Sequence, residues 1–236
     1  MADFFQIDPE TLAYWYLRLN GFLTITNFVV HPEWAGRQRT DVDVLAARFP
    51  HRRELFDMED DCAVVSSMTR ILIYLSEVKT GACNLNGPWT ERGKQNMQRV
   101  LRAVGAFPLE ATDEIADALY EQGFYEDQAV RISLMCVGSQ KNPEKRKQFP
   151  DVPQITWNHI LGFVFKRFNT YRDQKRDHPQ WPKKAQGLFK LAVKCGNESE
   201  FVRRIVVATE TTTAKTADEK ARSKKLLTKK SQESLF

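Results

Sequence analysis

One segment of the chain, Arg70 to Lys79 (RILIYLSEVK), restricts the possible folds more than any other. Its first half is almost continuously apolar and aliphatic, which is typical of a strand that is buried on both faces. A sheet covered on both faces needs helices on both sides. Side chains alternate along a strand, so Glu77 and Lys79 point to one face and Val78 points into the core. The segment therefore predicts a helix-covered sheet with charged groups at one strand end.

Helix-like and strand-like patterns follow one another along the rest of the chain. Asp8 and Pro9 are a typical helix start, since Asp is a favoured N-cap and Pro is favoured at the first helical position. We predict strands at 22–30, 41–49, 70–79, 130–137 and 201–207, helices at 8–20, 90–104, 112–122 and from 156 onward, and a loop at 139–153. This order predicts an α/β protein, a three-layer αβα sandwich with a central mixed sheet.

Length and composition limit the class of protein. A chain of 236 residues with 28% charged and 11% aromatic residues can bury a core. Four cysteines without a CxxC pair argue against a disulfide framework or a zinc knuckle, and we expect a soluble, cytoplasmic protein. The Thr- and Lys-rich stretch 208–236 carries seven basic and four acidic residues, so we expect one domain at 1–207 and a flexible basic tail at 208–236.

The residues that indicate chemistry are Asp43, Glu77 and Lys79. Charged groups at the end of so apolar a strand are costly to bury unless they are paired or bind a metal. In the preceding strand we expect Asp41 and Asp43 on one face and Val42 and Val44 on the other. Two carboxylates from adjacent strands form a hard oxygen site suited to Mg²⁺ or Mn²⁺. With a lysine beside them, they are suited to metal-assisted hydrolysis of a phosphodiester.

Asp43 lies 34 positions before Glu77, which is the first residue of the tripeptide Glu-Val-Lys. This pattern resembles that of the PD-(D/E)xK nuclease superfamily, which includes restriction endonucleases and Holliday-junction resolvases. The resemblance covers roughly residues 8–138 and implies a restriction-endonuclease-like αβββαβ core. It also implies that Asp43, Glu77 and the backbone carbonyl of Val78 bind the metal and that Lys79 is catalytic. No Pro precedes Asp43, and Asp41 is the alternative metal ligand.

Further candidates are less specific. Possible accessory residues at the site are Glu10, which the resemblance suggests, and Asp41, His31 and Gln95, with Gln98 on the same polar side of its helix. The candidate nucleic-acid contacts are basic residues in four places along the chain: Arg37, Arg39, Arg52, Arg53, Lys145, Arg146, Lys166 and Arg167. Each of these clusters is also compatible with an ordinary solvated surface.

The sequence thus favours a Mg²⁺- or Mn²⁺-dependent endonuclease, a hydrolase acting on nucleic acid, with DNA preferred to RNA. A restriction or antiphage-defence effector is compatible with this interpretation, as is a homodimer or a subunit of a larger complex. The alternative is a catalytically inactive nuclease-fold subunit that binds nucleic acid or serves as a scaffold. A second alternative is that Glu77 and Lys79 form a strand-end ion pair with no catalytic role.

Overall fold

The structure is a computed structural model, and it describes residues 5–31, 40–55, 57–67, 69–176 and 182–207. The expected tail at 208–236 and the candidate contacts Arg37 and Arg39 lie outside these residues.

The described residues form a central mixed sheet of six strands and a separate two-stranded sheet. The strands are β1 (Phe5–Ile7), β2 (Leu23–Val30), β3 (Thr40–Arg48), β4 (Ile71–Val78), β5 (Phe124–Glu126), β6 (Val130–Gly138), β7 (Gln154–Thr156) and β8 (Ile205–Val207). The central sheet has the order β2-β3-β4-β6-β5, and β7 also pairs with β6. Strands β2, β3 and β4 form an antiparallel meander, whereas β6 lies parallel to β4. This parallel step requires the crossover that the helices between β4 and β6 supply.

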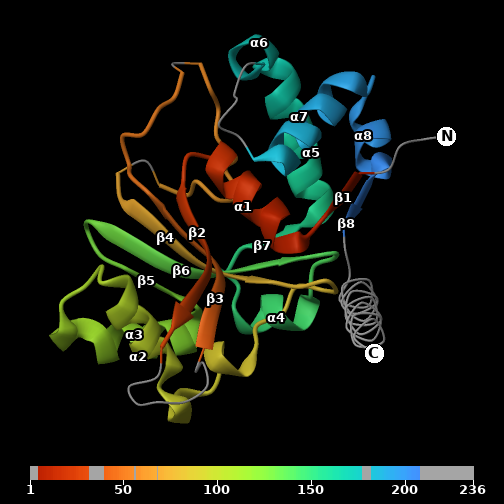
Figure 1. The fold of residues 1–236 in the computed structure, drawn as a ribbon. Coiled ribbons are helices and arrows are strands. Elements are labelled where there is room, and N and C mark those ends of the chain that lie inside the picture. The colour runs from red at the N-terminus through yellow and green to blue at the C-terminus, as the bar shows by residue number, and fades with distance from the viewer. Residues whose placement is uncertain (1–4, 32–39, 56, 68, 177–181, 208–236) are drawn as a thin grey trace, which may run out of the picture.

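Helices cover both faces of this sheet (Figure 1). The α-helices are α1 (Pro9–Leu19), α2 (Asn96–Val104), α3 (Thr112–Gln122), α4 (Pro143–Gln148), α5 (Trp157–Thr170), α6 (Arg172–Lys175), α7 (Lys183–Lys194) and α8 (Glu198–Arg204). Three 3₁₀ turns precede α2 and α3: η1 (Gly87–Trp89), η2 (Arg92–Lys94) and η3 (Leu109–Ala111).

Two hydrophobic cores lie on opposite faces of the sheet. One contains side chains of α1, α5, α7 and α8, and the other contains side chains of α2 and α3. Strand β4 contributes to both, with Leu72 and Tyr74 in the first core and Ile73 and Leu75 in the second. The predicted burial of β4 on both faces is therefore confirmed, and so is the α/β arrangement with a mixed, helix-flanked sheet.

Side-chain caps mark the residues at which α1 and α5 begin. The Asp8 carboxylate accepts a hydrogen bond from the Thr11 backbone N–H at 2.8 Å and caps α1, as predicted. Thr156 caps α5 in the same way through the backbone N–H of His159.

Three sequence-based predictions of secondary structure were wrong. The helix predicted from residue 90 begins only at Asn96, because Gln95 adopts a left-handed conformation with φ 52° and separates α2 from η2. The segment predicted as a loop contains α4, which Asn142 caps and Pro143 begins. The last predicted strand is mostly α8, which Asn197 caps and in which Phe201 is buried, and only its final residues form β8.

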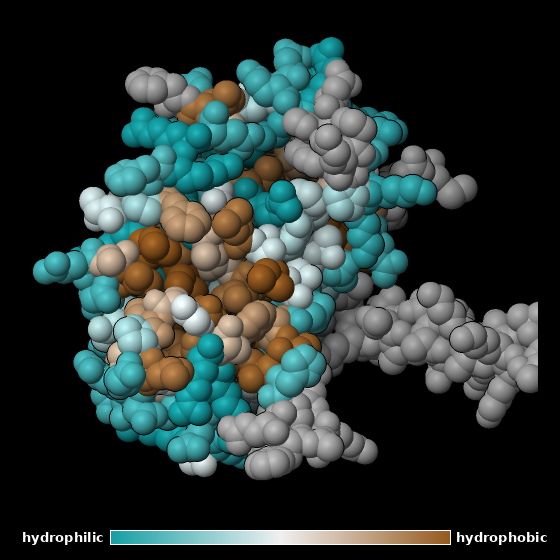
Figure 2. Space-filling view, turned by 60° about the vertical axis from the view of Figure 1, so that its left-hand side comes forward, coloured by the Kyte–Doolittle hydropathy of each residue, from teal (hydrophilic) through white to brown (hydrophobic). Residues whose placement is uncertain are grey.

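One face of the molecule carries a broad apolar area, seen in Figure 2. Large apolar side chains are exposed on the edge strand β2, at Leu23 and Ile25, and just after β3, at Phe49. No helix among the described residues is long and apolar enough to cross a membrane.

Candidate metal centre

The candidate centre lies where β3 and β4 separate. The antiparallel ladder between these strands runs from Arg48 opposite Leu72 to Val44 opposite Ser76. Beyond that point the backbone N–H of Val78 donates to Asp43 Oδ2 at 2.7 Å instead of to the backbone of β3. The N–H and C=O of one strand residue point to the same neighbouring strand, so the carbonyl of Val78 also faces this separation.

A distortion in β2 accompanies the separation. Asn27 has φ 51°, and it falls between the paired positions Thr26–Val44 and Phe28–Val42, across from Asp43. Asparagine is one of the few residues that tolerate this left-handed conformation. Val44 packs in the core beside α1, whereas Val42 packs in the core beside α2 and α3. The expectation that Val42 and Val44 share a face was wrong, because the strand alternation changes beside Asn27.

Glu77 is buried and is held by three donors. Its side chain is 5% exposed, and the Trp89 indole Nε1–H donates to Oε2 at 2.5 Å. The Asn86 side-chain amide and the Lys79 ammonium both donate to Oε1. Glu77 and Lys79 therefore do point to one side of β4, and the buried carboxylate has the partners that burial requires.

The carboxyl of Asp43 has a raised pKa. Burial raises the pKa of its carboxyl to about 7, with further increases from Glu77 and Glu10, against the opposing effect of the Val78 N–H hydrogen bond. The separation of the two strands therefore gathers negative charge that one lysine does not neutralise. A divalent cation is the kind of ligand that relieves such a charge arrangement.

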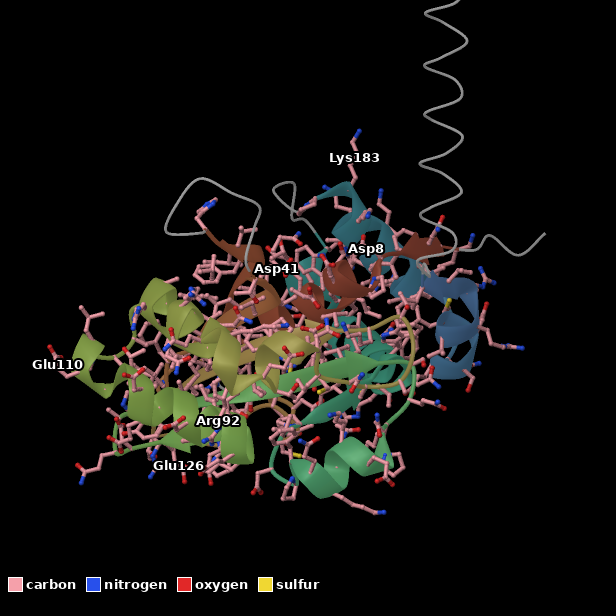
Figure 3. All side chains as sticks on the ribbon, turned by 90° about the horizontal axis from the view of Figure 1, so that it is seen from below. Asp8, Asp41, Arg92, Glu110, Glu126 and Lys183 are labelled. Atoms are coloured by element: carbon pink, nitrogen blue, oxygen red, sulfur yellow. The ribbon has the colours of Figure 1, made fainter. Side chains whose placement is uncertain are left out.

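Glu10 of α1 approaches the same place. Burial raises the pKa of Glu10, and so do the nearby carboxylates of Asp8 and Asp41, while a hydrogen bond from the Asn27 side chain lowers it. Figure 3 labels Asp8 and Asp41 and shows them on one side of the molecule, which agrees with this coupling. The first turn of α1 thus adds a carboxylate next to Asp43.

The donor set suits a hard divalent cation. Within the described ranges, no group of three His, Cys, Asp or Glu side chains is arranged to hold a metal ion. Asp43, Glu77 and the Val78 carbonyl provide only oxygen donors. Mg²⁺ is commonly held by one or two protein carboxylates and completes its shell with water and phosphate oxygens. The residues present fit Mg²⁺ or Mn²⁺, and they do not fit a cation that needs nitrogen or sulfur ligands.

The other acidic and polar candidates are placed less favourably. Asp41 pairs with Val29 in the regular β2–β3 ladder, so Asp43 and not Asp41 occupies the separation. His31 is exposed just after β2, and Gln95 is exposed between η2 and α2. Gln98 was expected on the polar side of its helix but is buried, with its Oε1 lacking a partner among the described residues.

The basic candidates divide into two groups. Lys145 and Arg146 lie on α4, and Lys145 and Lys79 both act electrostatically on Cys136 near the end of β6, which places α4 at the same end of the sheet as the candidate centre. Arg52 and Arg53 follow the opposite end of β3, beyond a strand stretch of about 16 Å. Arg52 and Arg53 therefore lie toward the other end of β3 from Asp43.

On α5, Lys166 is exposed but Arg167 is buried. The Arg167 guanidinium donates to the backbone carbonyl of Glu59 at 2.5 Å and lies 3.5 Å from Asp60 Oδ1. Asp60 also binds the buried Arg48 at 2.7 Å. Arg167 therefore anchors the acidic segment before β4 and was wrongly predicted as a nucleic-acid contact.

A second group of titratable residues lies beside a cavity of about 690 Å³ between this acidic segment and α5. Asp61 Oδ2 accepts a hydrogen bond from Tyr16 at 2.8 Å and lies 2.6 Å from His159 Nε2. Burial raises the pKa of Asp61, but hydrogen bonds from His159, the Ala63 N–H and Tyr16 outweigh it and lower the pKa to about 2. The same contact raises the pKa of His159. These groups satisfy one another and tie α1 to α5.

Two residues that contact Glu77, Asn86 and Trp89, were not among the sequence-based predictions. They follow Glu77 by 9 and 12 positions, in the turn Asn-Gly-Pro-Trp. The sequence signal that could have indicated them was a tryptophan directly after Gly-Pro, outside any pattern of helical spacing and shortly after Glu77.

No protein-family model matches the sequence, and neither a curated protein nor a solved structure is similar to the chain.

Proposed function

We propose that this chain is a metal-dependent nuclease of the PD-(D/E)xK type, an endonuclease that hydrolyses phosphodiester bonds in nucleic acid. The observation that carries the proposal is the meeting of Asp43, Glu77 and Lys79 where β3 and β4 separate. The order α1, β2, β3, β4, α2, β6, with β6 parallel to β4, supports the restriction-endonuclease-like αβββαβ core expected for that family.

Each residue has a role in this reaction. Asp43, Glu77 and the Val78 carbonyl would hold Mg²⁺ or Mn²⁺, with Glu10 as a neighbouring carboxylate. When bound, the cation would act as a Lewis acid on the scissile phosphate and lower the pKa of water. Lys79 is 25% exposed, so its ammonium can reach solvent and donate a hydrogen bond to the attacking water or to a phosphate oxygen.

The substrate is inferred from the charges near the centre. Lys141 and α4, with Lys145 and Arg146, place cations at the end of the sheet that carries Glu77. Exposed lysines and arginines beside a metal site are suited to phosphate contacts along a nucleic-acid backbone. DNA is the proposed substrate, and RNA is the comparison.

A second candidate function has one specific observation in its favour. Both oxygens of Glu77 already have hydrogen-bond donors from the protein, so the buried carboxylate is satisfied without a cation. A catalytically inactive subunit of the same fold that binds nucleic acid or serves as a scaffold would have this arrangement. A restriction or antiphage-defence effector that cuts only with its partner is a variant of the first proposal.

The test is cleavage by the purified full chain. We expect nicking or degradation of supercoiled plasmid with Mg²⁺ or Mn²⁺ and none with a chelator, with single-stranded DNA and RNA assayed in parallel. Lys79→Ala should abolish cleavage, whereas Lys190→Ala on the exposed side of α7 should leave it unchanged. Full activity in Lys79→Ala would refute the role of Lys79. Calorimetric titration with Mn²⁺ separates the alternatives, since an inactive subunit should release no heat of binding.

A further inference from the structure

The turn after β4 aims two fixed donors at Glu77. Asn86 precedes η1, and the Trp89 backbone N–H donates to the Asn86 carbonyl at 3.0 Å, which closes the turn. The indole of Trp89 is 1% exposed and packs in the core beside α2 and α3. Pro88 restricts the backbone between them. Side-chain packing thus keeps the Trp89 donor in place, and the turn places Asn86 beside Glu77.

The donors are distributed unequally over the two carboxylate oxygens. Asn86 and Lys79 both donate to Oε1, and Trp89 alone donates to Oε2. A carboxylate has about four acceptor positions, two on each oxygen. Oε1 is therefore saturated, and one position on Oε2 remains, next to the Trp89 N–H. Of the three donors, Lys79 is on a partly exposed side chain, whereas Trp89 is fully enclosed.

We propose that Asn86 and Trp89 are positioning residues that hold the Glu77 carboxylate for a divalent cation, and that the Trp89 indole responds to binding of that cation. This inference rests on the proposed metal centre but not on cleavage. Hydrogen-bond partners of a metal-binding side chain typically contribute 10- to 100-fold to metal affinity. Because the indole N–H donates directly to the ligand carboxylate, cation binding changes the electrostatic environment of the indole ring.

Titration of the metal-free full chain with Mn²⁺, followed by calorimetry and tryptophan fluorescence, tests the proposal. Trp89→Phe keeps an aromatic ring and removes the N–H donor. Trp157→Phe is the matched control, because the Trp157 indole nitrogen is buried without a partner among the described residues and its side chain packs on the opposite core. We expect wild type and Trp157→Phe to bind Mn²⁺ with a fluorescence change, and Trp89→Phe to bind about 10-fold more weakly without that change.

Asn86→Ala provides a second variant, since Asn86 is exposed and its replacement leaves the core intact. It should also weaken Mn²⁺ binding about 10-fold. Wild-type affinity in both Trp89→Phe and Asn86→Ala would overturn the positioning role while leaving the nuclease proposal in place. Absence of Mn²⁺ binding to the wild type would refute the metal centre itself, and the positioning role with it.

Discussion

Replacing Asp43 with Asn should remove most of the fall in stability that its carboxyl causes as pH rises. The native carboxyl titrates near pH 7, whereas in the unfolded chain it titrates near its ordinary value of 3.8. Between these values the native state binds more protons than the unfolded state, so the free energy of unfolding falls as pH rises. Roughly three pKa units at 1.36 kcal/mol each give about 4 kcal/mol, which we reduce to about 2 kcal/mol because the side chain is partly exposed.

Thermal or urea unfolding in chelator at about pH 5 and pH 8 measures this difference. Because pH 5 already lies above the unfolded value, about two of the three pKa units fall in this range, so the Asp43 carboxyl should cost wild type about 1.3 kcal/mol, or about 3–5 °C in Tm. Asp43→Asn should lose much less, because the amide does not titrate and can still accept the Val78 N–H hydrogen bond. Asp41→Asn, in the same strand, is the control and should follow wild type. If Asp43→Asn and wild type lose stability in parallel, the pKa of Asp43 is not raised in the folded protein.

Three further predictions concern the groups that support the sheet. Asp61→Asn should lower the free energy of unfolding by about 1–2 kcal/mol. The loss should be larger at pH 6 than at pH 8, because the raised pKa of His159 stabilises the fold only while the imidazole is protonated. An equal loss at both pH values would contradict this. Arg48→Met should lower the free energy of unfolding by about 3 kcal/mol, because it leaves Asp60 without its 2.7 Å partner. Urea unfolding measures this loss, and a loss below about 1 kcal/mol would argue against the ion pair. Leu75→Ala, at a fully buried position of β4, should cost about 2–5 kcal/mol in the same assay, and a neutral result would place this strand outside the core.

Much of the fold was predictable because its signals are local. The Asp8-Pro9 helix start and the apolar run of β4 depend on short stretches of sequence, and both were correct. The segment 197–207 was harder, because Phe201 and its apolar neighbours fit a strand pattern as well as a helix capped by Asn197. The choice there depends on packing against α5, which no local pattern encodes.

The candidate site was predictable in part for the same reason. Glu77 and Lys79 lie on one side of one strand, so their pairing follows from alternation alone. The left-handed Asn27, the separation of β3 from β4 and the hydrogen bond from Trp89 to Glu77 are tertiary features. Sequence spacing carries no direct information about them. Likewise, the burial of Arg167 depends on the acidic segment folding back onto α5.

Anomalous diffraction from a Mn²⁺-soaked crystal tests the central claim most directly. We expect one strong anomalous peak about 2.0–2.3 Å from oxygens of both Asp43 and Glu77, at the point where β3 and β4 separate. A peak elsewhere on the protein, or none at all while Lys79 and Asn86 remain bound to Glu77, would contradict it.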